Sequence, residues 1–276
     1  MIKSPKAPGA FQAKSRRFPL SRTYVMGILN ITPDSFSDGG QYFEPEKALA
    51  RAKEMEAQGA DIIDIGGQST RPGYTPLSPE EEWLRLREIL PRVAAETEAA
   101  ISVDTFYPQV AEKALAAGAD IINDVSGFGE EMLRAVAGSG CGCVVMYPKG
   151  GEGGNILEQA KGFFGNRMEA AGKFGIQPQL LCMDPGIGFG KTMEENYALI
   201  ARLREAKLPG VACLMAASRK RVTGAPCGNP PFAQRLPATL AAHTAAILAG
   251  ADMVRVHDVK EAVQAARMAD ALKQWN

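Results

Sequence analysis

The sequence lacks the features that would place the chain in a membrane, outside the cell or on nucleic acid. No apolar run approaches the roughly 18 to 20 residues of a membrane helix, and the N-terminus has no apolar core of a secretory signal. Charge of neither sign is in excess, because 31 basic residues balance 31 acidic ones, so no net field attracts polyanions. We therefore expect a soluble, cytoplasmic protein that binds neither membranes nor nucleic acid.

Cysteine is scarce, and its pattern suggests neither disulfides nor a metal centre. The five cysteines are an odd number in a chain of 276 residues, and Cys182 and Cys213 fall in apolar, strand-like runs. This pattern predicts free thiols in a reducing compartment. Cys141 and Cys143 lack a second Cys/His pair at metal-ligand spacing, so we interpret them as small buried side chains.

Motifs for nucleotide binding and for nucleophilic catalysis are also missing. In the glycine-rich stretch 184–192, Pro185 occupies the place of the first glycine of a Walker A loop, and the glycine spacing does not match G-x-G-x-x-G. No nucleophile elbow is present. His243 lies in an alanine-rich helical pattern and is interpreted as a structural residue rather than a ligand. Kinase and NAD-dependent chemistry are therefore disfavoured.

A short repeat organises the chain. Gly-Ala-Asp followed by two aliphatic residues occurs at 59–63, 118–122 and 250–254. Each copy follows an alanine-rich helical pattern, so its glycine predicts a helix end in the left-handed conformation, and its aliphatic pair predicts the start of a buried strand. The copies are separated by near multiples of about 30 to 33 residues, which is the length of one strand-plus-helix unit.

The same pattern predicts eight strands with helices between them. The strands are expected at residues 24–30, 61–66, 100–104, 120–124, 142–147, 180–184, 211–216 and 252–257. Pro45 at a first turn, an apolar stripe and Gly59 predict the first of the helices. Apolar strands that alternate with helices specify a parallel sheet covered by helices. Eight similar units favour closure into a single-domain α/β fold, a (β/α)8 or TIM barrel, and a doubly wound open sheet is the alternative.

The N-terminal segment differs from the rest in charge. Its first 22 residues contain several basic side chains and no acidic one. A transit peptide is the less favoured interpretation because no long amphipathic helix is present. We expect residues 1–22 to be a flexible basic arm and residues 23–276 to form the barrel domain.

Polar side chains stand at the carboxyl ends of nearly all the predicted strands. The residues at or just after these ends are Asn30, Asp64, Asp104, Asn123, Asp124, Met146, Asp184, Ser218, Arg219, Lys220, Arg255 and His257. In a barrel these ends meet at one mouth, where catalytic groups lie. A ring of polar groups costs too much desolvation to arise by accident, so it implies a polar ligand.

Two loops at the predicted mouth have an unusual composition. Residues 30–40 and 66–73 are dense in hydroxyl side chains and glycine. Such loops can fold over an anion, and the same composition is also typical of ordinary turns. Composition alone leaves both interpretations open.

Several motifs in order make the chain resemble the dihydropteroate synthase family. The resemblance spans roughly residue 25 to the C-terminus, and motifs in order are far more specific than any one of them. They are MGILNITPDSFSDGG (26–40), STRPG (69–73), SVDT (102–105), INDVSG (122–127), DPGIGFGKT (184–192), SRK (218–220) and RVHDV (255–259).

The resemblance implies a transferase that joins a pterin-methyl pyrophosphate to p-aminobenzoate in folate biosynthesis, with Mg²⁺ and as a homodimer. In the family the C–O bond at the pterin methylene is thought to break before the amine attacks. The protein would then stabilise the departing pyrophosphate and a delocalised pterin cation. No nucleophilic side chain is needed for this substitution.

The resemblance also implies a role for each motif residue. Carboxylates and an amide suit the edge of a pterin, while arginine and a hard cation suit phosphate oxygens. Asp104, Lys220 and Arg255 are expected to contribute to catalysis. The pterin would lie against Asp104, Asn123, Asp184 and Lys220, with Mg²⁺ at Asn30, the phosphates or bridging region at Thr70, Arg255 and His257, and p-aminobenzoate beside Arg71, Pro72, Phe189 and Ser218. Met146 is also expected to bind substrate.

The chain departs from the family pattern at three places. Gln68 stands where the family usually has Glu, Tyr147 and Pro148 replace the usual His-Met pair, and Ala216 replaces a glycine beside the expected pterin floor. The methyl group of Ala216 is expected to crowd a flat ring. Two alternatives therefore stay open: a non-catalytic pterin-binding paralogue, and a pterin-barrel methyltetrahydrofolate methyltransferase, whose relatives lack the PDSF and STRP loops.

Overall fold

In the computed structural model, which describes residues 9–31, 45–68, 75–150 and 153–275, the strands close into a barrel. Neighbouring strands pair in the order β10-β3-β4-β5-β6-β7-β8-β9, and every pair is parallel. The strands are β3 (Tyr24–Asn30), β4 (Ile62–Gly66), β5 (Ala100–Asp104), β6 (Ile121–Asp124), β7 (Gly142–Met146), β8 (Leu181–Asp184), β9 (Ala212–Met215) and β10 (Met253–Val256). The predicted (β/α)8 barrel is confirmed, and the open sheet is excluded.

The observed strands agree with the predicted ranges to within one residue at each end. The repeated glycines explain part of this agreement. Gly59, Gly118 and Gly250 have φ values of 100°, 111° and 113°, in the region where an L side chain is strained. Each glycine therefore ends one helix and directs the chain into the next buried strand.

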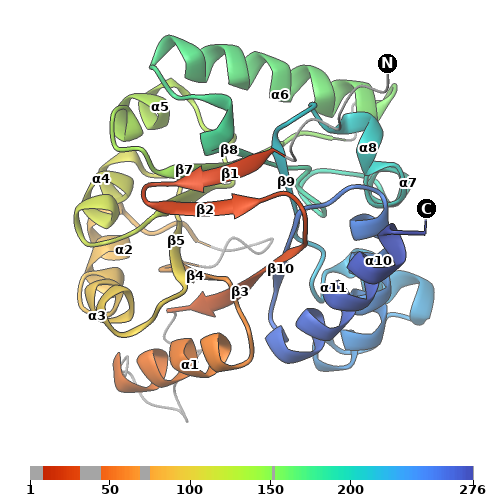
Figure 1. Ribbon diagram of the computed structural model, residues 1–276, viewed down its shortest axis with the longest axis horizontal. Coiled ribbons are helices and arrows are strands. Elements are labelled where there is room, and N and C mark those ends of the chain that lie inside the picture. The colour runs from red at the N-terminus through yellow and green to blue at the C-terminus, as the bar shows by residue number, and fades with distance from the viewer. Residues whose placement is uncertain (1–8, 32–44, 69–74, 151–152, 276) are drawn as a thin grey trace, which may run out of the picture.

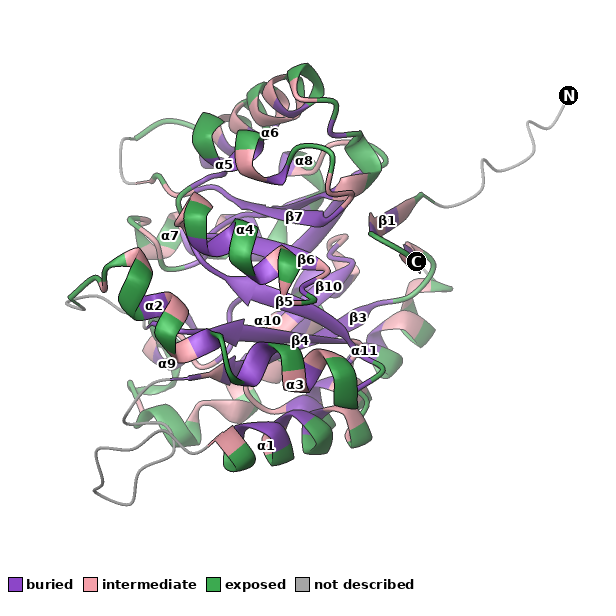
Figure 2. Ribbon diagram, turned by 90° about the vertical axis from the view of Figure 1, so that its left-hand side faces the viewer, coloured by how far each residue is buried: buried purple, intermediate pink, exposed green. Residues whose placement is uncertain are grey.

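Helices cover the outside of the barrel (Figure 1). In Figure 2 the strands are buried, and the helices turn a buried side inward and an exposed side outward. The helices are α1 (Pro45–Ala57), α2 (Pro79–Leu86), α3 (Ile89–Glu96), α4 (Pro108–Ala116), α5 (Glu130–Val136), α6 (Ile156–Lys173), α7 (Met193–Ala201), α8 (Leu203–Ala206), α9 (Arg221–Gly224), α10 (Leu236–Leu248) and α11 (Val259–Lys273), with short 3-10 turns at Pro178–Leu180, Ala225–Cys227 and Phe232–Gln234.

Side-chain caps fix the start of two helices near the mouth. The hydroxyl of Ser78 accepts a hydrogen bond from the Glu81 N–H before α2, and the Glu81 carboxylate accepts one from the Ser78 N–H. Thr192 and Glu195 form the same reciprocal pair before α7. Such pairs satisfy N–H groups that a helix start leaves open. They also fix where the loops that precede α2 and α7 must end.

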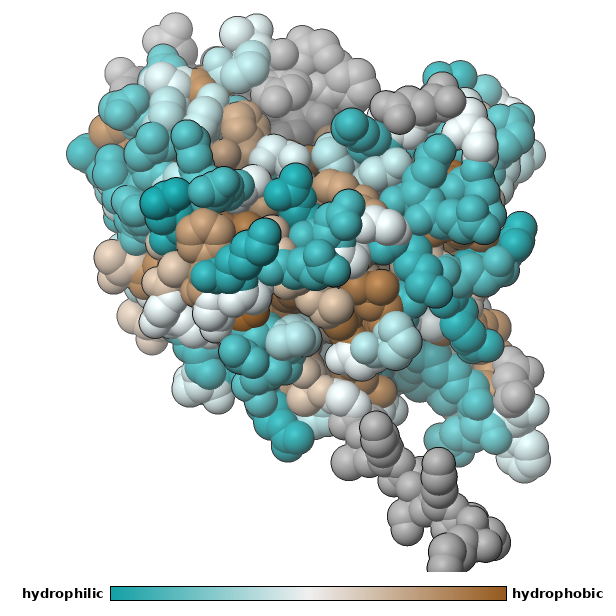
Figure 3. All heavy atoms as spheres, turned by 90° about the horizontal axis from the view of Figure 1, so that it is seen from above, coloured by the Kyte–Doolittle hydropathy of each residue, from teal (hydrophilic) through white to brown (hydrophobic). Residues whose placement is uncertain are grey.

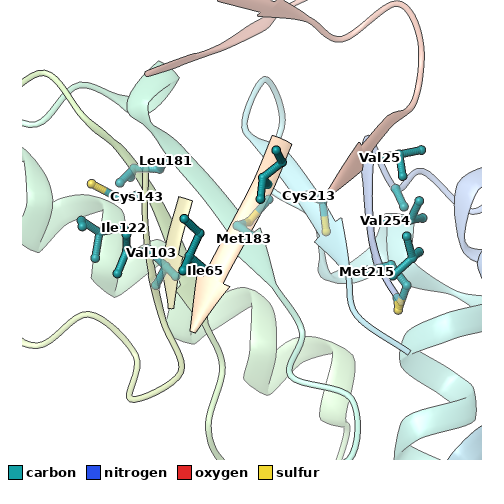
Figure 4. Packing of buried hydrophobic residues seen from close by; sticks show 14 of the residues in the cluster. Val25, Ile65, Val103, Ile122, Cys143, Leu181, Met183, Cys213, Met215 and Val254 are labelled. Carbon is teal, nitrogen blue, oxygen red and sulfur yellow. The ribbon is translucent and has the colours of Figure 1, made fainter. Parts of the chain in front are cut away.

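Strand side chains alternate between two apolar layers, because successive residues of a strand point to opposite faces. The outward layer packs against the helices and contains Val25, Ile65, Val103, Ile122, Cys143, Leu181, Met183, Cys213, Met215 and Val254 (Figure 4). The inward layer fills the half of the barrel at the amino ends of the strands, which we call the lower half. It contains Tyr24, Met26, Ile62, Ala100, Ile121, Val144, Cys182, Ala212, Leu214 and Met253. The lower barrel is therefore a packed core rather than a pore.

A hairpin closes the lower end of the barrel, where the prediction from charge was wrong. β1 (Ala10–Ala13) and β2 (Arg16–Pro19) pair antiparallel and cross the end of the barrel that faces the viewer in Figure 1. Phe11, Ala13 and Phe18 are buried in the inner layer, and a Cβ at Gly142 would overlap the Phe11 ring. Burial of alternate apolar residues thus outweighs the basic charge at residues 10–19, which are not a flexible arm. Residues 1–8 lie outside the described part.

The outer surface is largely polar. In the face seen in Figure 3, hydrophilic side chains predominate and smaller apolar areas lie between them. In the part of the chain that the structure describes, no helix is both long enough and apolar enough to cross a membrane.

Candidate active site

Above the apolar inner layer, the inward-facing side chains of the strands become polar. Each polar residue follows an inward apolar residue by two positions, so alternation along the strand turns it to the barrel axis. Because the strands are parallel, these side chains meet near the carboxyl ends of the strands. They are Asp64 after Ile62, Ser102 after Ala100, Asn123 after Ile121, Asp184 after Cys182, and Arg255 after Met253.

Arg255 connects carboxylates from two other strands. Its Nε donates to Asp64 Oδ2 at 2.6 Å, and its Nη2 donates to Asp104 Oδ2 at 2.8 Å. Asp64 also accepts hydrogen bonds from Ser102 Oγ at 2.5 Å and from Asn123 Nδ2 at 3.2 Å. This network joins β4, β5, β6 and β10 and forms the floor of the site.

The charges of this floor depend on one another. Burial raises the pKa of Asp104, and the guanidinium of Arg255 opposes that shift. Burial also disfavours the charged form of Arg255, but Asp64 and Asp104 raise its pKa overall. Asn123 Oδ1 is buried and has no hydrogen-bond partner among the described residues. Because buried acceptors are normally paired, this oxygen suits an N–H donor of a ligand.

Lys220 and Asp184 form a second charged group beside the floor. Lys220 Nζ donates to the Ile187 carbonyl at 2.7 Å and lies 4.7 Å from the centroid of the Phe189 ring. Burial lowers the pKa of Lys220 to about 8, and Asp184 opposes this shift. Burial raises the pKa of Asp184, which Lys220 and the Gly186 N–H oppose. The group offers a carboxylate, a cation and an aromatic face to one ligand.

Ser218 and His257 lie together at the rim. Ser218 Oγ and His257 Nδ1 are 2.9 Å apart, and the His257 N–H donates to Ser218 Oγ at 3.2 Å. The ring of Phe232 packs edge-on against His257, with centroids 5.2 Å apart. A hydroxyl and an imidazole at this place can bind an anion such as a phosphate group.

Asn30 is the residue that we expect from the sequence to bind Mg²⁺. It ends β3, and its Oδ1 lies beside Gly66, 3.6 Å from where a Cβ would stand. Among the described residues, no group of three or more His, Cys, Asp or Glu side chains could hold a metal. Mg²⁺ usually takes one or two protein oxygens and completes its shell with water and substrate phosphates. One amide oxygen at the mouth therefore fits a cation that arrives with a phosphate ligand.

Of the predicted site residues, those that the structure describes lie around one mouth. Met146 ends β7 and packs beside Gly186. Thr70, Arg71 and Pro72 lie outside the described residues, so their places stay predictions. The two charged groups, the rim and the strand ends bring together Asn30, Asp104, Asn123, Met146, Asp184, Phe189, Ser218, Lys220, Arg255 and His257.

Sequence reasoning gave no role to three residues of the site: Asp64 and Ser102, which are buried, and Lys191, which is partly buried. Asp64 was noted only as a strand end, yet it is fully buried and accepts from three side chains. Ser102 stands two residues before Asp104, and this spacing could have placed it on the inward face. Lys191 donates to two loop carbonyls, and nothing in the sequence signals this contact.

The structure places the three departures from the family pattern near the mouth, and the expected effect of Ala216 on a ligand ring stays a prediction. Gln68 Oε1 accepts from the Leu77 N–H at 3.3 Å. The Tyr147 N–H donates to the Asp184 carbonyl at 2.8 Å. Ala216 is buried, and its place two residues after Leu214 turns it inward at the mouth.

Known proteins are similar to this chain along nearly its whole length. The model of the family described as pterin binding enzyme matches residues 26–257. A dihydropteroate synthase of Synechocystis sp. is 42% identical over 261 residues, which cover 91% of this chain and 90% of that protein. Solved structures of Xanthomonas albilineans dihydropteroate synthase, one with 4-aminobenzoic acid and one in complex with 7,8-dihydropteroate, have TM-scores of 0.90 and 0.87 at 39% and 37% identity. Each match covers 96% of this chain and 98% of that chain.

Proposed function

The chain belongs to the family of pterin-binding enzymes, and we propose that it has dihydropteroate synthase activity. In this transferase reaction, 6-hydroxymethyl-7,8-dihydropterin pyrophosphate and p-aminobenzoate give 7,8-dihydropteroate and pyrophosphate, a step of folate biosynthesis. Relatives with this activity in their names match nearly the whole chain, and two solved structures contain the amine substrate or the product.

The observation that carries the proposal is the buried polar floor. Asn123 Oδ1 is an unpaired acceptor among the described residues, and the carboxylates of Asp104 and Asp184 are buried near it. The edge of a pterin presents ring N–H and amino donors that such acceptors can pair with. Rings that lack these donors would leave the acceptors unpaired and would bind far more weakly.

The reaction needs positioning and charge rather than a nucleophilic side chain. The C–O bond between the pterin methylene and pyrophosphate breaks, a C–N bond to the arylamine forms, and the amine releases a proton to solvent. Asp104 and Asp184 favour the positive charge that develops on the ring. Arg255 supplies positive charge for the departing pyrophosphate, and His257, held by Ser218, binds it at the rim. Phe189 and Lys220 border the place from which the amine attacks.

The proposed cofactor is Mg²⁺, held by Asn30 together with the substrate phosphates. When bound, the cation neutralises charge on the leaving group. The support is the single amide oxygen at the end of β3, which suits a cation that keeps substrate oxygens as ligands. Turnover should therefore fall when a chelator removes Mg²⁺ and recover when Mg²⁺ is added back.

Incubation of the purified protein with both substrates and Mg²⁺, followed by chromatographic detection of dihydropteroate, tests the function. Lys220→Ala and Asp184→Asn should each reduce product below detection while the circular dichroism spectrum stays native. Lys161→Ala, at an exposed position of α6, is the matched control and should retain turnover. Turnover like that of the unmodified protein in either site variant contradicts the site assignment. Pterin binding by the unmodified protein without release of pyrophosphate would instead identify a non-catalytic paralogue.

We also propose that the protein is a homodimer that acts in the cytoplasm. From residue 236 to 251 the chain has no charged residue, although α10 lies at the surface and its residue Ala245 is exposed. On the adjoining α11 and just after it, Met268, Leu272 and Trp275 are exposed. A second copy of the chain suits this apolar surface. The cytoplasm is supported by the five cysteines, which are all free thiols.

A further inference from the structure

Lys191 lies where two loops of the mouth meet. Its Nζ donates at 2.9 Å to the carbonyl of Tyr147, which follows β7 directly. It also donates at 3.1 Å to the carbonyl of Phe189, in the loop after β8. The same ammonium group lies 4.8 Å from the centroid of the Tyr147 ring. One side chain therefore joins the β7–α6 loop to the β8–α7 loop.

The two loops are in close backbone contact at this point. A Cβ at Gly186 would overlap the carbonyl oxygen of Tyr147, and a Cβ at Gly150 would overlap Cγ of Lys191. Such close approach is open only to glycine. The lysine therefore adds a hydrogen bond to each loop at a point where the two backbones already pack together, and its removal should alter the position of Phe189, whose carbonyl it binds.

Phe189 is held from two sides. Lys191 binds its carbonyl, and the ammonium group of Lys220 lies over its ring while binding the Ile187 carbonyl. Two lysines thus set both the backbone and the ring of this aromatic residue. Burial lowers the pKa of Lys191 to about 8, and Asp184 opposes this shift. At neutral pH most of the ammonium form remains, with donors for both carbonyls.

We propose that Lys191 is a positioning residue for the p-aminobenzoate side of the site. By binding the carbonyls of Tyr147 and Phe189, it sets where the Phe189 wall stands relative to the pterin floor. This inference rests on the proposed function, since it assigns to Lys191 a part in recognising the second substrate of that reaction.

Steady-state kinetics and pterin binding together test this role. Lys191→Met keeps the length of the stem and removes the charge and the donors. It should raise the KM for p-aminobenzoate about 10-fold or more, as expected for loss of a charged hydrogen bond. The Kd of the pterin pyrophosphate, measured by calorimetry, should change less than about 3-fold. Lys191→Arg, which keeps the charge and the donors, should restore most of the KM of the unmodified protein.

Three outcomes overturn the inference. One is a Lys191→Met variant whose KM for p-aminobenzoate matches that of Lys161→Met, an exposed control on α6. Another is an equal loss of pterin affinity, which would assign Lys191 to the pterin floor through Asp184. If the Met variant does not fold, Lys191→Gln takes its place, and an unchanged KM there counts equally against the role. Absence of turnover in the unmodified protein would refute the proposed function, whereas turnover that Lys191→Met leaves unaltered refutes this inference alone.

Discussion

Glu82 is a buried carboxyl group of α2 that links two loops of the mouth. Its side chain is fully buried and accepts a hydrogen bond from Thr105 Oγ1 at 2.8 Å. Thr105 directly follows Asp104, and a Cβ at Gly67 would come within 2.9 Å of Glu82 Cγ. Burial raises the pKa of Glu82 from 4.5 to about 7, and the hydrogen bond from Thr105 opposes the shift.

This raised pKa makes stability depend on pH in a defined direction. Between pH 4.5 and 7 the folded protein keeps the Glu82 proton and the unfolded chain loses it, so the free energy of unfolding falls as pH rises through this range. Glu82→Gln removes this titration. From pH 5 to pH 8, the free energy of unfolding of the variant should rise by up to about 3 kcal/mol relative to that of the unmodified protein.

Urea unfolding of both proteins at pH 5 and pH 8 measures this difference. Glu80→Gln changes an exposed residue of the same helix and should give no such gain. Parallel pH profiles for Glu82→Gln and the unmodified protein would show that Glu82 is not protonated in the fold.

At the scale of residues, the sequence predicted the ring of polar strand ends but not the partners of each member. Asp104, Asn123, Asp184 and Arg255 could be found because parallel strands deliver their ends to one mouth. Glu82 stands in a run of three glutamates at a helix start, which is typical of a solvated first turn. The residues that follow β4 and β5, Gly67 and Thr105, pack against its side chain, and such contacts between distant segments cannot be found from local sequence.

The hairpin of β1 and β2 contributes to the stability of the fold at the end of the barrel opposite the candidate active site. Phe11 is fully buried against the inner layer, and its ring lies 5.8 Å from that of Phe18. Phe11→Ala should therefore lower the free energy of unfolding by about 3 to 5 kcal/mol. Gln12→Ala, at the next and only partly buried position of β1, should change it by less than about 0.5 kcal/mol.

Chemical denaturation of the two variants makes this comparison, and turnover without denaturant should persist in both. Equal stabilities of Phe11→Ala and Gln12→Ala would mean that the hairpin contributes little to the core.

At the scale of elements, the strands of the barrel were predictable and the hairpin was not. Buried strands are continuous apolar runs between helical patterns, and this contrast is strong in the sequence. In the hairpin, Phe11, Ala13 and Phe18 alternate with polar residues, but Lys14, Arg16 and Arg17 dominate the composition. The alternation of these apolar residues could have predicted two half-buried strands, but the basic composition favoured an exposed arm instead.

For the whole molecule, the homodimer proposal predicts that one charge on α10 separates the subunits. Ala245 lines a surface groove of about 540 Å³ together with Leu248, Ala249 and the charged residues Arg202, Arg204 and Glu205. Ala245→Arg would place a long charged side chain on the uncharged surface of α10, which costs binding energy in the proposed interface. Light scattering after size-exclusion chromatography should give the mass of a dimer for the unmodified protein and of a monomer for the variant.

Ala116→Arg, at an exposed position at the end of α4, is the control and should remain dimeric. A monomeric unmodified protein at micromolar concentration, or a dimeric Ala245→Arg variant, contradicts the proposed interface.

Because the hairpin packs across the lower end, we expect ligands to reach the described part of the barrel from the mouth at the carboxyl ends of the strands. The groups suited to a pterin, such as Asn123, lie below those suited to the amine and the phosphates, such as Phe189 and His257. We therefore expect the pterin substrate to bind before p-aminobenzoate, and dihydropteroate to leave before the next pterin binds. The depth of each group in the barrel therefore predicts ordered binding of the two substrates, with the product competing with both.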